Sequence, residues 1–126
     1  MTKPYNVSYD SEAGYVTVRV VGSATHEDHC AARDEAVLLC KRNACFRLLV
    51  DLRGLSTVRS STVSCFSFGA SLANEPQHYR IAHVLPKDVK SAADVRFTST
   101  VEANRGITAG EFQSIEEAEQ WLREGP

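Results

Sequence analysis

The fold is decided by the stretch FRLLVDLRGLST, residues 46–57. Its first five residues form an apolar run with one arginine, which is typical of a short strand buried on both faces of a parallel sheet. Asp51 follows this run, and the polar and glycine-containing residues 51–57 predict a loop at the carboxyl end of the strand. We therefore predict that residues 46–50 form the central strand of a sheet.

Helices are predicted on both sides of this strand. Before it, Thr25 with Asp28 three residues later is a capping-box pattern, and residues 25–43 contain no glycine or proline. The positions expected to be buried recur at helical spacing and are Ala32, Ala36, Leu39 and Cys40. After the strand, residues 60–73 repeat apolar positions every three or four residues and predict a second helix, which ends before Pro76.

The amino-terminal segment predicts two strands. Residues 6–9 and 15–21 alternate between apolar and polar side chains, with Gly14 in the short connection between them. A hairpin at one side of the sheet is the simplest arrangement of these two segments.

The carboxyl-terminal segment predicts two further strand and helix pairs. Residues 80–85 read as a strand, and Asp88 is expected to cap a helix that ends before Gly106. The inner face of that helix is predicted to carry Val89, Ala93, Phe97 and Val101. Residues 107–112 are weakly strand-like, and a capping box at Ser114 begins a final helix. That helix is expected to bury Ile115, Ala118, Trp121 and Leu122.

The order of these elements predicts an α/β fold. Strands that alternate with helices form a mainly parallel sheet, so we expect a sandwich of a five-stranded mixed sheet and about four helices. With 126 residues, the chain is long enough for one hydrophobic core, and we predict a single domain over residues 1–126.

The composition excludes several classes of protein. The chain is 43% hydrophobic and 24% charged with a net charge of -2, which is typical of a globular protein and gives no field that would attract nucleic acid. Its longest apolar runs are too short for a membrane span, which needs about 20 residues. Residues 1–10 are polar and lack the pattern of a secretory signal, so a cytoplasmic location is expected.

Cysteine and histidine residues give a weak chemical signal. Cys30, Cys40, Cys45 and Cys65 have no C-x-x-C spacing, and we interpret them as small core residues with reduced thiols. His26, His29 and Cys30 would share one helix face, as zinc ligands can. The spacing does not match H-E-x-x-H, however, and an exposed helix start is the favoured interpretation. We therefore predict no metal site and no cofactor.

A binding site is expected at the carboxyl end of the central strand, where open α/β sheets hold their ligands. The candidate residues are Asp51, Arg53, Arg59, Ser60 and Ser61. The start of the helix at Ser60 presents unpaired backbone N–H groups and a partial positive charge, to which the two arginines add full charges. An anionic group is the expected ligand, although the alternative that Ser60 is only a helix cap is favoured.

The sequence contains no recognised catalytic motif. It has no G-x-S-x-G turn for a nucleophilic serine and no glycine-rich loop of the nucleotide-binding kinds. We therefore expect that the protein is not an enzyme.

The chain resembles the STAS domains, and the SpoIIAA-like branch among them. The resemblance is carried by the order of elements, by DLRGL at residues 51–55, by Ser60 and Ser61 at the start of a helix, and by the segments RIAHV and EFQSIEEA at residues 80–84 and 111–118. It covers nearly the whole chain. The anti-sigma factor antagonists of that family carry Asp-Ser-Ser-Gly where this sequence has Arg59-Ser60-Ser61-Thr62.

The resemblance implies two functions. The first is a regulatory or protein-interaction module with a kinase or a sigma-factor regulator as partner, in which Ser61 would be the phosphorylated serine. The alternative is a carrier of a small apolar or lipid-like ligand, because the SpoIIAA-like fold has been likened to lipid-transfer domains. The oligomeric state is left open, and a homodimer is among the possibilities.

Overall fold

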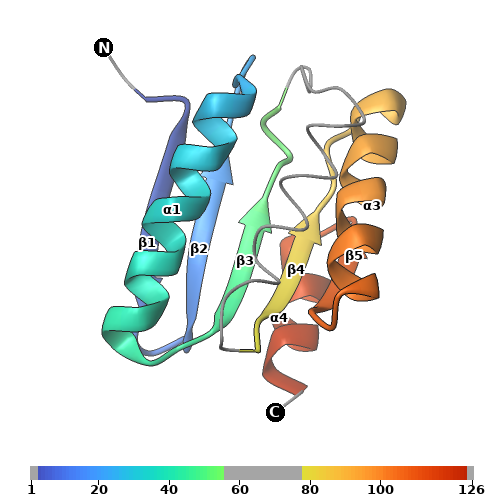
Figure 1. Cartoon of the computed structure of the whole chain (residues 1–126). Helices are drawn as coiled ribbons and strands as arrows, with labels where there is room; N and C mark the ends of the chain where they lie inside the picture. Colours follow the sequence, from blue (N-terminus) through green and yellow to red (C-terminus); the bar gives the residue numbers. More distant parts are fainter. Residues whose placement is uncertain (1–2, 56–77, 125–126) are drawn as a thin grey trace.

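The computed structural model describes residues 3–55 and 78–124, which form a single sheet with helices on both faces (Figure 1). The predicted helix at residues 60–73 lies outside the described residues. The strands of the described part are β1 (Tyr5–Asp10), β2 (Tyr15–Val20), β3 (Arg47–Asp51), β4 (Arg80–Val84) and β5 (Thr108–Phe112). The helices of that part are α1 (His26–Asn43), α3 (Val89–Asn104) and α4 (Ile115–Glu124).

The five strands lie in the sheet in the order in which they occur along the chain, β1-β2-β3-β4-β5. β1 and β2 form the predicted antiparallel hairpin, and β2 to β5 are parallel to one another. β3 is therefore the central strand, as the sequence predicts. The register places Arg19 of β2 and Val84 of β4 on either side of Asp51.

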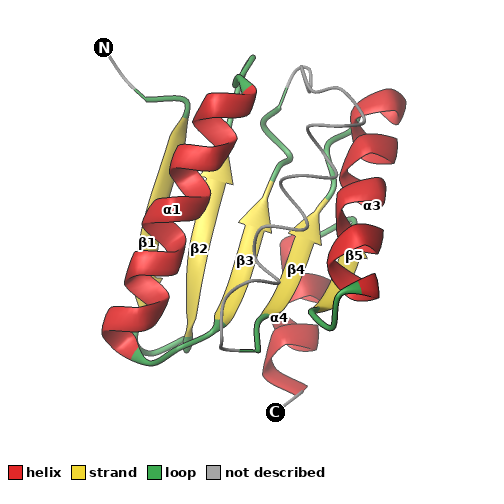
Figure 2. Cartoon of the chain, viewed as in Figure 1, coloured by secondary structure: helices red, strands yellow, loops and turns green. Residues whose placement is uncertain are grey.

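The helices cover the two faces of the sheet unequally. α1 packs on β1 and β2, α3 packs on β5, and both lie on the same face, whereas α4 lies on the opposite face against β3, β4 and β5 (Figures 1 and 2). The alternation along β3 shows this division, because Leu48 belongs to the core under α1 and α3 while Leu49 belongs to the core under α4.

Helix α1 forms as the sequence predicts. Thr25 and Asp28 make the reciprocal hydrogen bonds of a capping box, and Ala44 ends the helix in the left-handed conformation with φ 49°. The predicted stripe faces the sheet: Ala32, Ala36 and Cys40 are buried, and Leu39 is partly buried.

Helix α3 begins at the predicted cap, but three of the four residues predicted for its inner face are exposed, and of the four Val101 alone is buried as predicted. The Asp88 side chain accepts hydrogen bonds from the Ser91 backbone N–H at 2.9 Å and from its hydroxyl at 2.8 Å. Val89 is 82% exposed and Phe97 is 38% exposed, and Ala93 is exposed as well. The buried positions are Ser91, Ala92, Val95, Ser99, Val101 and Glu102.

Polar partners explain this difference on α3. Glu102, which is 1% exposed, shares a hydrogen bond with His83 Nε2 at 2.8 Å, and Ser99 donates one to Glu111 at 3.1 Å. His83 and Glu111 are neighbours on β4 and β5. A prediction based on hydrophobic spacing places such polar residues outside, because it cannot see the partners that permit their burial.

Helix α4 is held at its carboxyl end by two arginines from the sheet. Arg47 donates a hydrogen bond to the Leu122 carbonyl, and Arg80 donates one to the Trp121 carbonyl at 2.6 Å. Both carbonyls belong to the last turn of α4, where helices need partners from outside the helix for their C=O groups. The Arg80 guanidinium also lies 3.8 Å from the centre of the Trp121 ring. Ala118 and Leu122 are buried as predicted, whereas Ile115 and Trp121 are only partly buried.

Replacing Glu102 by alanine tests the buried pair on α3. The change leaves His83 Nε2 without its hydrogen-bond partner in a buried position, so we expect the free energy of unfolding to fall by about 3 kcal/mol. Urea denaturation measures this difference. The exposed Glu124 provides a matched control, and an equal effect of Glu124→Ala would show that the buried pair contributes nothing specific.

Candidate functional site

The loop after β3 is fixed against both neighbouring strands. The Leu52 backbone N–H donates to the Val84 carbonyl at 3.0 Å, and Gly22, just beyond β2, donates to the Gly54 carbonyl at 2.9 Å. A side chain at Gly54 would place its Cβ 2.8 Å from Val21, so glycine allows this close approach. The loop therefore holds a defined position at the carboxyl edge of the sheet.

Asp51 is the buried centre of the candidate site. The residue is 3% exposed, and Arg53 contacts both of its carboxylate oxygens. Arg53 Nε donates to Oδ1 at 3.0 Å and Arg53 Nη2 donates to Oδ2 at 3.1 Å. The Arg53 backbone N–H also donates to Oδ1 at 3.1 Å. This bidentate contact fixes the Arg53 guanidinium group in one orientation.

Arg19 completes the site from the neighbouring strand. Its Nε lies 3.3 Å from Asp51 Oδ2, because the parallel register of β2 and β3 places these two residues side by side. The Arg19 side chain is 60% exposed and the Arg53 side chain is 46% exposed, so both guanidinium groups also face solvent. One buried carboxylate thus holds two outward-facing cations.

The electrostatics of the site favour binding over proton transfer. Burial alone would raise the pKa of Asp51, but hydrogen bonds from Arg53 and the charges of Arg53 and Arg19 lower it overall. The Asp51 contacts in turn raise the pKa of Arg53. Asp51 is therefore ionised at neutral pH with both oxygens occupied, which makes it a poor general base.

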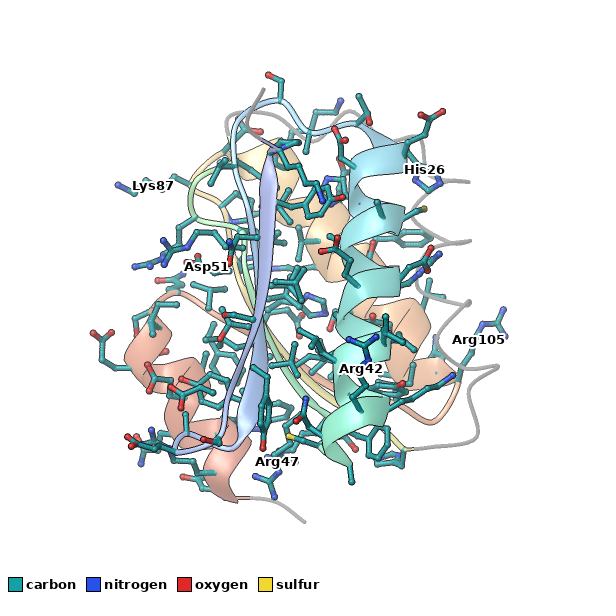
Figure 3. All side chains as sticks on the ribbon, turned by 90° about the vertical axis from the view of Figure 1, so that its left-hand side faces the viewer. His26, Arg42, Arg47, Asp51, Lys87 and Arg105 are labelled. Atoms are coloured by element: carbon teal, nitrogen blue, oxygen red, sulfur yellow. The ribbon has the colours of Figure 1, made fainter. Side chains whose placement is uncertain are left out.

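The site opens toward the half of the sheet that α4 leaves uncovered. Figure 3 shows the molecule from the side of β1, with Asp51 and Lys87 on the α4 side of the sheet and His26 and Arg42 on the α1 side. On the Asp51 side, β1 exposes Asn6, Ser8 and Asp10. A polar strip of sheet therefore adjoins the arginine pair.

The structure brings together only part of the predicted site. Asp51 and Arg53 are in contact as described above, whereas Arg59, Ser60 and Ser61 lie outside the described residues. The phosphorylation of Ser61 therefore stays a prediction. Sequence reasoning missed Arg19, although the alternation in residues 15–21 places its side chain on one face with Tyr15 and Thr17. The missing information was the register between β2 and β3.

The histidine and cysteine cluster lies at the start of α1. Cys30 Sγ is 3.4 Å from His26 Nε2, so the helical spacing does bring them together. Burial, followed by the charge of His26, lowers the pKa of His29. Within residues 3–55 and 78–124, no three such side chains are arranged to hold a metal ion.

The cysteines differ in their surroundings. Cys40 is fully buried, and burial raises the pKa of its thiol to about 12, which fits the predicted core role. Cys30 and Cys45 are only partly buried, so the prediction that they are core residues is wrong. Cys65 lies outside the described residues.

Comparison with known proteins identifies the fold. No protein-family model matches the sequence, and no curated protein matches it significantly. Among solved structures, the chain is similar to an uncharacterized protein of the DUF3478 family with a SpoIIAA-like fold from Shewanella loihica PV-4. The TM-score is 0.55 at 18% identity, over 94% of this chain and 91% of that one. The fold is therefore SpoIIAA-like, as the sequence resemblance implies. No helix of the described part is long and apolar enough to cross a membrane.

Replacing Asp51 by asparagine tests the electrostatic description of the site. The asparagine amide is uncharged and offers the two arginines one acceptor oxygen instead of two, so at pH 7 we expect the free energy of unfolding to fall by about 2 kcal/mol. The pKa of Asp51 is lowered in the folded state. Its stabilising effect is therefore complete above the unfolded pKa of about 3.9 and disappears as the pH falls through the lower folded value. Denaturant unfolding of both proteins at several pH values measures this, and a difference that stays constant down to about pH 2 would contradict it.

Proposed function

We propose that this protein is a non-enzymatic interaction module that binds an acidic segment of a partner protein through Arg19 and Arg53. The observation that carries the proposal is the arrangement around Asp51, in which a buried carboxylate fixes two guanidinium groups that remain open to solvent. Guanidinium groups that are held in place bind carboxylates with less loss of side-chain entropy than mobile ones.

The charge balance supports an anionic partner. The Asp51, Arg19 and Arg53 side chains together carry a net charge of +1, whereas the chain as a whole carries -2, and the carboxylate of Glu116 also acts on Arg53. The positive charge of the site is thus a local feature that a partner can recognise. A protein segment is favoured over a small anion because exposed polar side chains of β1 extend the surface beyond the arginines.

A peptide titration tests the proposal. An extended peptide of six glutamates should shift the side-chain NMR signals of Arg19 and Arg53, with binding that weakens as sodium chloride is added. Arg53→Gln should weaken binding about tenfold, which corresponds to the loss of one charge-assisted hydrogen bond of about 1.5 kcal/mol. Inorganic phosphate, titrated in parallel, shows whether a single small anion suffices.

Arg96→Gln is the matched control, because Arg96 is exposed on α3 and its replacement changes the net charge by the same amount. We expect this variant to bind as the parent protein does. Equal weakening by Arg53→Gln and Arg96→Gln would show that binding is a general charge effect. A small apolar molecule that copurifies with the protein, seen by native mass spectrometry, would favour the carrier function instead.

A further inference from the structure

The edge of the sheet at β1 has the features of a surface that pairs with another strand. β1 pairs with β2 over six consecutive residues in unbroken register, so it contains no bulge, and it contains no proline. α1 covers one face of β1, and the opposite face exposes polar side chains. Proteins usually protect such edges with prolines, bulges or inward-pointing charges.

The backbone groups of β1 alternate in direction. The Val21 N–H donates to the Pro4 carbonyl at 2.8 Å, and the antiparallel register continues from this pair. In an antiparallel pair, every second residue directs both its N–H and its C=O toward the partner strand. Tyr5, Val7 and Tyr9 therefore direct theirs away from β2, along the outer edge.

Helix α1 presents a self-complementary stripe beside this edge. Lys3 Nζ, next to the start of β1, lies 3.4 Å from Glu35 Oε1, so the Glu35 side of α1 faces the edge. Leu38 and Arg42 follow on the same side at helical spacing. Leu38 is 49% exposed, Arg42 is exposed, and Arg42 lies on the viewer's side of α1 in Figure 3, which looks onto the β1 edge.

We infer that the β1 edge and this stripe of α1 bind a second copy of the chain around a two-fold axis perpendicular to the sheet. Such an axis makes the two α1 helices antiparallel, and we place it beside the exposed Leu38, between Leu38 and Leu39. Glu35 of each copy then lies opposite Arg42 of the other, which is the reciprocal pattern that a two-fold interface requires. This inference goes beyond the proposed anion site and does not depend on it.

The spacing of the elements agrees with this arrangement. α1 packs over both β1 and β2, and neighbouring strands are about 4.8 Å apart. Pairing two β1 edges therefore places the two α1 axes about 10 Å apart, close to the usual distance of roughly 8–10 Å between packed helices.

The other edge of the sheet fits a partner less well. β5 contains Gly110, and α3 and α4 pack against it from opposite faces. If β5 of a second copy paired with β5 of the first, α3 and α4 of both copies would have to fit beside the new pair of strands. Within residues 3–55 and 78–124, the β1 edge has a helix on one face only.

Light scattering after size-exclusion chromatography tests the inference. The protein should have twice the 13.9 kDa mass of one chain. Leu38→Glu should give a folded monomer, because it places like charges at the centre of the contact. Val89→Glu changes an apolar residue that is 82% exposed on α3, and it should leave the dimer intact.

A charge exchange provides the decisive comparison. In the Glu35→Arg variant, the new arginine faces Arg42 of the other copy, so the affinity of the dimer should fall at least about tenfold. Combining Glu35→Arg with Arg42→Glu should restore that affinity. In hydrogen exchange, the amides of Tyr5, Val7 and Tyr9 should be protected in the dimer and exposed in the Leu38→Glu monomer. A monomeric parent protein, or a dimer that survives both Leu38→Glu and Glu35→Arg, would overturn the inference.

Discussion

The contact between Asp51 and its two arginines is the interaction on which the candidate site depends. Asp51 ends the central strand at a buried position, where an unpaired carboxylate would be costly. Arg53 and Arg19 offset that cost from the following loop and from the neighbouring strand. The same contacts orient both guanidinium groups at the edge where α/β sheets bind their ligands. The contacts that stabilise the buried Asp51 carboxylate are thus the same contacts that position Arg19 and Arg53 for the proposed binding.

Most of the fold could be predicted from residues whose local signals agree. The apolar run before Asp51 identifies the central strand, and the caps at Thr25 and Asp88 mark the beginnings of α1 and α3. The inner face of α3 could not be predicted in this way. Its burial is decided by hydrogen bonds of Ser99 and Glu102 with β4 and β5, which are distant in sequence.

The candidate site shows the same division between local and distant information. Asp51 and Arg53 are two residues apart, so a local pattern sufficed to select both. Arg19 is far away in the sequence and meets Asp51 only through the register of β2 and β3. The hydrophobic pattern selects which face of a strand is buried, but it does not select which residue of the next strand lies alongside.

The affinity of Asp51→Asn for the acidic peptide tests the central claim most directly. This substitution makes the protein less negative by one charge, so attraction by net charge alone would strengthen binding. If Asp51 acts by holding Arg19 and Arg53 in position, the variant should bind the peptide more weakly than the parent protein while remaining folded. Equal or stronger binding by the folded variant would contradict the claim that the buried carboxylate organises the site.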